Sequence, residues 1–148
     1  TAEEAQSADK ISVASDCLGM NDTILISAGI GMMGGFGVRV NLTKNDFEPY
    51  YFMYTDDVEP YRKKGDTVYK ASVEVPCIKA NLILEDSVMM VSDNIMSGFL
   101  EFTSDEFFHK ASAENDPDNV HQIAGRVYFR CKLKMYYPNI IKEGPMDD

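Results

Sequence analysis

The feature that most constrains the fold is a strict alternation of apolar and polar side chains over residues 126–135. Val127, Phe129, Cys131, Leu133 and Met135 occupy every second position, with arginine, tyrosine or lysine between them. Because successive side chains of a strand point to opposite faces, this period of two predicts a β-strand with one apolar face and one cationic or amphipathic face. Such a strand is typical of an antiparallel sheet with one buried and one solvated side.

Similar short runs recur along the chain. We expect further strands near residues 10–15, 23–28, 36–42, 50–55, 69–75, 81–85, 88–91 and 97–103. Stretches with the helical period of 3.6 are nearly absent. Many short strands at regular spacing predict an all-β fold, a single antiparallel β-barrel or β-sandwich of about eight strands, rather than an α/β fold.

Turn residues and short helical signals separate these runs. Asp86 and Ser87 predict a tight hairpin between two strands, and Pro76 is expected to end the strand before it. Residues 43–47 and 103–107 each place a threonine three residues before an acid, the second as a capping box. We therefore expect one or two short helical turns at these positions.

Length and composition predict one domain. A chain of 148 residues can bury a core without added cross-links. We expect a flexible polar leader over residues 1–10, a β domain over 11–137 and a frayed tail over 138–148. The small polar leader resembles the tether that remains after a signal or lipoprotein leader is removed, and a trimmed chain would look the same. The expected location is extracytoplasmic (secreted, periplasmic or lipid-anchored), with the cytoplasm as the alternative.

The charge narrows the classes of partner. A net charge of −10 argues against nucleic acid and against anionic membrane surfaces, which both attract basic proteins. No apolar run approaches the roughly 20 residues that span a bilayer, so we do not expect a membrane-spanning protein. The acidic surface serves solubility or attracts a basic partner.

Three cysteines, Cys17, Cys77 and Cys131, lie far apart without the C-x-x-C spacing of metal or redox sites. Cys131 falls on the apolar face of its strand, which favours a buried and inert thiol over a reactive one. In an exported protein, one disulfide and one free thiol is the alternative, with the pairing undetermined by the sequence.

The sharpest motif match is G-x-G-x-x-G at residues 29–34, directly after a predicted strand. In a dinucleotide site these glycines precede a helix whose N-terminus holds the pyrophosphate. Here Gly35 and Gly37 stand where that helix would run, and glycine costs about 1 kcal/mol per helical position relative to alanine. Glycines of a hairpin, a bulge or a close strand crossing are the better interpretation.

His109 and His121 are the only histidines, and Asp105, Asp116 and Asp118 lie near them in sequence. A mixed metal site can be drawn from these residues, but it lacks a recognised ligand spacing, so surface or capping histidines are favoured. The acidic loop around Pro117 does not match an EF-hand. No serine stands in a nucleophile motif, although a small hydrolase that uses His109 or His121 remains one alternative. We predict no catalytic residues, no metal and no cofactor.

An aromatic segment is the best candidate for binding. Tyr50, Phe52 and Tyr54 share one face of a predicted strand, and tyrosine combines an apolar ring with a polar tip. The competing interpretation is an interior strand buried on both faces. The candidate ligand-binding residues in and after this strand are Tyr50, Tyr54, Asp56, Asp57, Tyr61 and Arg62.

The sequence thus favours a non-catalytic extracytoplasmic binding domain for a small molecule, a glycan or a protein partner. The first alternative is an acidic inhibitor or immunity-type protein that neutralises a basic partner, and the second is the small hydrolase. The oligomeric state stays open.

Overall fold

The computed structural model describes residues 13–137, which form ten strands and no helix. The strands are β1 (Ala14–Met20), β2 (Thr23–Gly31), β3 (Gly34–Leu42), β4 (Phe47–Thr55), β5 (Tyr61–Lys63), β6 (Ser72–Leu84), β7 (Ile95–Ser104), β8 (Phe107–His109), β9 (Asn119–His121) and β10 (Ala124–Tyr136). The predicted leader and tail lie outside the described residues. None of the described residues belongs to a helix long and apolar enough to cross a membrane.

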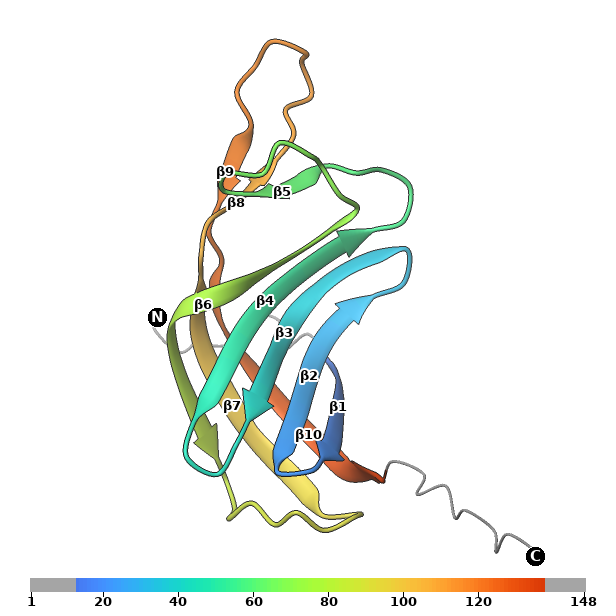
Figure 1. Ribbon diagram of the computed structural model, residues 1–148, viewed down its shortest axis with the longest axis vertical. Coiled ribbons are helices and arrows are strands. Elements are labelled where there is room, and N and C mark those ends of the chain that lie inside the picture. Colours follow the sequence, from blue (N-terminus) through green and yellow to red (C-terminus); the bar gives the residue numbers. More distant parts are fainter. Residues whose placement is uncertain (1–12, 138–148) are drawn as a thin grey trace, which may run out of the picture.

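Seven of the strands close into a barrel in the order β1-β10-β7-β6-β4-β3-β2. The three short strands form a separate sheet in the order β5-β8-β9, which we call the cap sheet, beyond one end of the barrel (Figure 1). The all-β prediction is confirmed. The G-x-G-x-x-G run lies in the β2–β3 hairpin and is followed by a strand rather than a helix.

The barrel closes where its first and last strands meet. β1 and β10 pair in parallel, whereas the other neighbours in the barrel are antiparallel. Cys17 and Cys131 form a disulfide across this seam, with their Cα atoms 5.7 Å apart and 114 residues between them in sequence. Cys131 is buried as predicted, but it is not a free thiol, and Cys77 is the one unpaired cysteine of the described residues.

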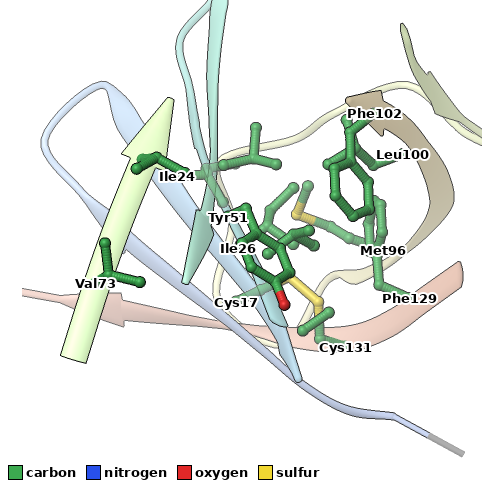
Figure 2. Close-up of a cluster of buried hydrophobic side chains, with 14 of the residues drawn as sticks. Cys17, Ile24, Ile26, Tyr51, Val73, Met96, Leu100, Phe102, Phe129 and Cys131 are labelled. Atoms are coloured by element: carbon green, nitrogen blue, oxygen red, sulfur yellow. A yellow bond between two sulfur atoms is a disulfide. The ribbon is translucent and has the colours of Figure 1, made fainter. Parts of the chain in front are cut away.

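Apolar side chains from every strand of the barrel wall fill its interior. Ile24 and Ile26 of β2, Val73 of β6 and Leu100 of β7 surround Tyr51 of β4 and the disulfide (Figure 2). These side chains occupy alternate positions of their strands, so the period of two seen in the sequence is the alternation between the inside and the outside of the barrel.

Strand β6 is longer than predicted and changes partner at Pro76. Before this residue it pairs with β4, and after it with β7, with a register shift between Cys77 and Lys79. The prediction that Pro76 ends the strand is wrong because Pro76 still faces Tyr50 of β4 and Cys77 already faces Ser104 of β7, so the strand continues on its new partner. The predicted hairpin at Asp86 and Ser87 is also wrong, since residues 85–94 form a connection without strands.

The predicted helical turn at residues 103–107 is replaced by the entry into β8. Phe107 is 1% exposed and packs on Tyr51, so tertiary burial of its ring overrides the local capping signal. Ser104, which belongs to that signal, accepts a hydrogen bond from the backbone N–H of Ile123 instead. Residues 43–47 also form no helix.

Candidate functional site

Strand β4 forms part of the barrel wall, and its side chains alternate between the two sides of that wall. Tyr51 is 2% exposed and Met53 packs against the same core. By alternation Tyr50, Phe52 and Tyr54 point outward, and all three are partly exposed. The interpretation of this segment as an interior strand buried on both faces therefore fails for the outer face.

The rings of Phe52 and Tyr54 lie over a floor of glycines on β2 and β3. A Cβ atom at Gly37 would stand 2.7 Å from Cζ of Phe52, and one at Gly31 would stand 2.5 Å from the Tyr54 hydroxyl. The two ring centres are 6.5 Å apart and their planes are inclined by 21°. Because glycine has no side chain, the rings can extend across the neighbouring strands. The glycines of this floor are Gly29, Gly31, Gly35 and Gly37.

Two charged side chains flank these rings. Arg39 of β3 faces Tyr50, and Glu74 of β6 faces Phe52 on the other side of β4. Nη1 of Arg39 lies 2.5 Å from Oε2 of Glu74, and its guanidinium carbon lies 5.5 Å from the centre of the Phe52 ring. The two side chains are 40% and 39% exposed, so this ion pair adds little to the stability of the fold.

We call Arg39, Tyr50, Phe52, Tyr54 and Glu74 the β4 outer surface. It presents apolar ring surface beside a guanidinium and a carboxylate. The Nε–H of Arg39 is buried and has no hydrogen-bond partner among the described residues. Sequence reasoning missed Arg39 and Glu74 because they are 35 residues apart and meet only through the order of the strands.

Asp56 and Asp57 follow β4 directly and lie at the rim of the barrel. Both are exposed. They line an open hollow, which we call the rim hollow, together with Glu59, Tyr69 and Lys110. The structure thus places these two predicted residues next to the end of β4 but in a separate, more acidic environment than the aromatic rings.

Tyr61 does not share this surface. It is 5% exposed and belongs to the core, with its ring 6.3 Å from Phe107 and 5.4 Å from His109 between ring centres. Burial raises the pKa of its hydroxyl. Its position points to a role in attaching the cap sheet to the barrel.

Arg62 lies on the other face of the cap sheet, in a network of its own. Its Nε donates to Oδ2 of Asp118 at 2.6 Å, the Tyr69 hydroxyl donates to the same oxygen at 2.6 Å, and its guanidinium lies 4.2 Å from the centre of the Phe108 ring. The hydrogen bonds from Tyr69 and then Arg62 lower the pKa of Asp118. This network fixes the segment before β9 against the segment before β6.

His109 and His121 come together on the cap sheet, with ring centres 6.0 Å apart. The acids that the sequence placed near them do not join them, since Asp118 is bonded to Arg62 and Tyr69. Over residues 13–137 there is no group of three or more histidines, cysteines and acids that could hold a metal ion.

Comparison with protein-family models, with curated proteins and with solved structures gives no significant match.

Proposed function

We propose that this protein is a non-catalytic binding domain whose β4 outer surface recognises a glycan. The observation that carries the proposal is the pair of partly exposed rings, Phe52 and Tyr54, held over a glycine floor beside the Arg39–Glu74 pair. Large aromatic side chains that stay accessible outside a filled core are typical of recognition surfaces.

An open surface suits an extended ligand better than a small enclosed one. Side chains such as Tyr51, Leu100 and Phe102 fill the inside of the barrel. The rim hollow beside Asp56 and Asp57 opens to solvent. A chain-like ligand lying along β4 could contact both the rings and this acidic rim, whereas a small ligand would bury little of its surface in either place.

The chemistry of the surface matches a sugar ring. A sugar has a face of C–H groups that packs on an aromatic ring and hydroxyl groups around its edge. The tyrosine hydroxyls, the Arg39 guanidinium and the Glu74 carboxylate supply donors and acceptors for those hydroxyls. Arg39 also has an N–H without a partner, which a bound ligand can satisfy after a small movement of the side chain.

The test is binding to a panel of neutral and acidic oligosaccharides, with Tyr54→Ala compared with Tyr128→Ala. Tyr128 is a matched control, because it also lies on the outside of the barrel beside another aromatic ring, that of Phe99. We expect at least one oligosaccharide to bind, Tyr54→Ala to weaken it about tenfold or more, and Tyr128→Ala to leave it unchanged. Equal effects of the two substitutions, or no bound oligosaccharide, would reject the proposal.

We further propose an extracytoplasmic location, which the Cys17–Cys131 disulfide supports, since such bonds persist in oxidising compartments. The check is mass spectrometry of protein alkylated without reduction directly in its native cells. One alkylated cysteine, Cys77, is expected, and three would contradict the proposal.

The rim hollow favours a second candidate function, neutralisation of a basic partner. Asp56, Asp57 and Glu59 are exposed there, in a chain of net charge −10. Binding to poly-L-lysine should then weaken steeply with salt and fall in Asp56→Asn/Asp57→Asn. The control is Asp22→Asn/Asp46→Asn, which removes equal charge from turns at the opposite end of the barrel (Figure 1). Equal losses in the two variants would leave only a general charge effect and exclude this site.

A further inference from the structure

The two histidines of the chain meet although twelve residues separate them in sequence. In the pairing of β8 with β9, Phe107 faces His121 and His109 faces Asn119. His109 and His121 are therefore diagonal neighbours on one face of the cap sheet, and their ring centres are 6.0 Å apart with planes inclined by 74°. Both side chains are partly exposed, so solutes can reach them.

Packing holds both rings in place, and a hydrogen bond also holds the ring of His109. The His121 ring stacks on Phe107 at 5.5 Å between centres, and the edge of the His109 ring meets Tyr61 at 5.4 Å. Nδ1 of His109 lies 2.9 Å from the carbonyl oxygen of Lys110. Because a carbonyl can only accept, Nδ1 carries the proton in this contact, and Nε2 of the neutral ring keeps its lone pair.

We propose that His109 and His121 form a two-histidine binding site for a late first-row divalent cation, Cu²⁺ or Zn²⁺. Imidazole nitrogens are preferred ligands of both ions. Nitrogen-to-metal distances of about 2.0–2.1 Å place the centres of two ligating rings about 5 Å apart at a tetrahedral angle, so the two rings, 6.0 Å apart, have to move about 1 Å closer to share an ion. A backbone carbonyl that fixes the second ring nitrogen, as Lys110 does for His109, is a usual partner of a metal-binding histidine.

The remaining coordination positions belong to water or to an added ligand. No third histidine, cysteine or acid of the described residues completes the site. We therefore expect an exchangeable ion rather than one that the fold requires. The site also discriminates by chemistry, because Ca²⁺ and Mg²⁺ require oxygen ligands and no carboxylate of the described residues joins the two histidines.

The site is independent of the proposed glycan surface. The histidines lie on the cap sheet, whereas the β4 outer surface belongs to the barrel wall. A negative result for one site therefore does not count against the other site.

The experiment is calorimetric titration of the whole chain with CuCl₂ and with ZnCl₂, in a Cys77→Ser background that removes the free thiol. The variants are His109→Gln, His121→Gln and the double substitution. We expect one ion per chain, a loss of affinity of about tenfold or more in each single variant, and little further loss in the double variant, because a chelate fails when either ligand is removed. Ca²⁺ and Mg²⁺ should not bind at the histidines.

Unchanged affinity in either single variant would overturn the proposal. The proposal would also fail if the loss of binding free energy in the double variant equals the sum of the two single losses. A second measurement avoids substitution. Substoichiometric Cu²⁺ should broaden the imidazole proton signals of both histidines together in NMR spectra. Broadening of only one histidine, or of neither, would contradict a shared site. Melting curves in EDTA serve to confirm that each variant is folded.

Discussion

The inner and outer sides of the barrel wall at β4 carry the same kinds of residue in different surroundings. Tyr51, on the inside, is 2% exposed and lies between Phe102 and Phe107, with ring centres 6.0 and 5.9 Å away. Tyr54, on the outside, is partly exposed and lies over Gly31 and Gly35. The residue type is the same, so the parity of the position along the strand decides whether a tyrosine serves the fold or remains accessible for binding.

The largest expected effect separates these two tyrosines by stability. Tyr51→Ala removes a ring from the core and should lower the free energy of unfolding by about 3–5 kcal/mol. Tyr54→Ala removes a ring that is bounded by solvent on one side and should cost less than about 1.5 kcal/mol. Urea unfolding measures both values. Similar losses for the two variants would mean that the outer tyrosine is as much a part of the core as the inner one.

The disulfide tests whether the inner side depends on closure of the barrel. Replacing both Cys17 and Cys131 by alanine removes a cross-link between residues 114 positions apart in sequence. The free energy of unfolding should fall by about 2–5 kcal/mol. Cys77→Ala is the control, because Cys77 is unpaired and only half-buried. Equal unfolding midpoints for the double variant and the wild type would show that strand pairing alone closes the seam.

A smaller effect tests the outer side. A Cβ atom at Gly37 would collide with the Ala28 carbonyl and stand 2.7 Å from Phe52, so Gly37→Ala should destabilise by about 1–3 kcal/mol. At Gly125 the nearest atom to an added Cβ is 3.5 Å away, so Gly125→Ala should change stability by less than about 0.5 kcal/mol. If Gly37→Ala unfolds at the same urea concentration as Gly125→Ala, the Ala28 carbonyl and the Phe52 ring do not lie as close to Gly37 as the structure places them.

The smallest expected effect is a pH dependence to which the inner tyrosine contributes together with the buried hydroxyl of Tyr61. Burial, and secondarily the neighbouring Tyr61, raise the pKa of Tyr51 to about 12. The unfolded chain has the ordinary tyrosine pKa of about 10, so it loses this proton at lower pH than the folded chain does. The contribution of Tyr51 to stability is therefore complete below about pH 10 and declines as the pH rises toward 12.

The measurement is urea unfolding between pH 9 and the alkaline limit of the fold, with Tyr51→Phe as the comparison, since phenylalanine cannot ionise. The variant should lose stability less steeply with rising pH than the wild type. Parallel curves would show that Tyr51 is accessible to water.

Period-two alternation made much of the barrel predictable. It placed β2, β3, β7 and β10 within a few residues and put Cys131 on a buried face, because one apolar side must enter the core. The cap sheet was not predictable in the same way. Its strands have three residues each, too few for a pattern, and Phe107 enters β8 because of contacts with residues distant in sequence.

The candidate site was predictable only in part. Alternation placed Tyr50 and Tyr54 on one face, but it could not say which face of β4 was the outer one. Proximity in sequence also grouped Tyr61 and Arg62 with them, because the sequence does not show that the chain leaves the barrel after Asp57 and enters the cap sheet. Arg39 and Glu74 required the order of β3, β4 and β6 to be known.

In the proposed binding function the outer side of β4 contacts the ligand, while the inner side only stabilises the fold. The most direct test is backbone and side-chain NMR during titration with an oligosaccharide that the binding panel retains. We predict that shift changes cluster at Arg39, Tyr50, Phe52, Tyr54 and Glu74, and that signals of the β10 outer face around Tyr128 stay fixed. Shift changes centred on β10 or on the cap sheet, with β4 unaffected, would contradict the account.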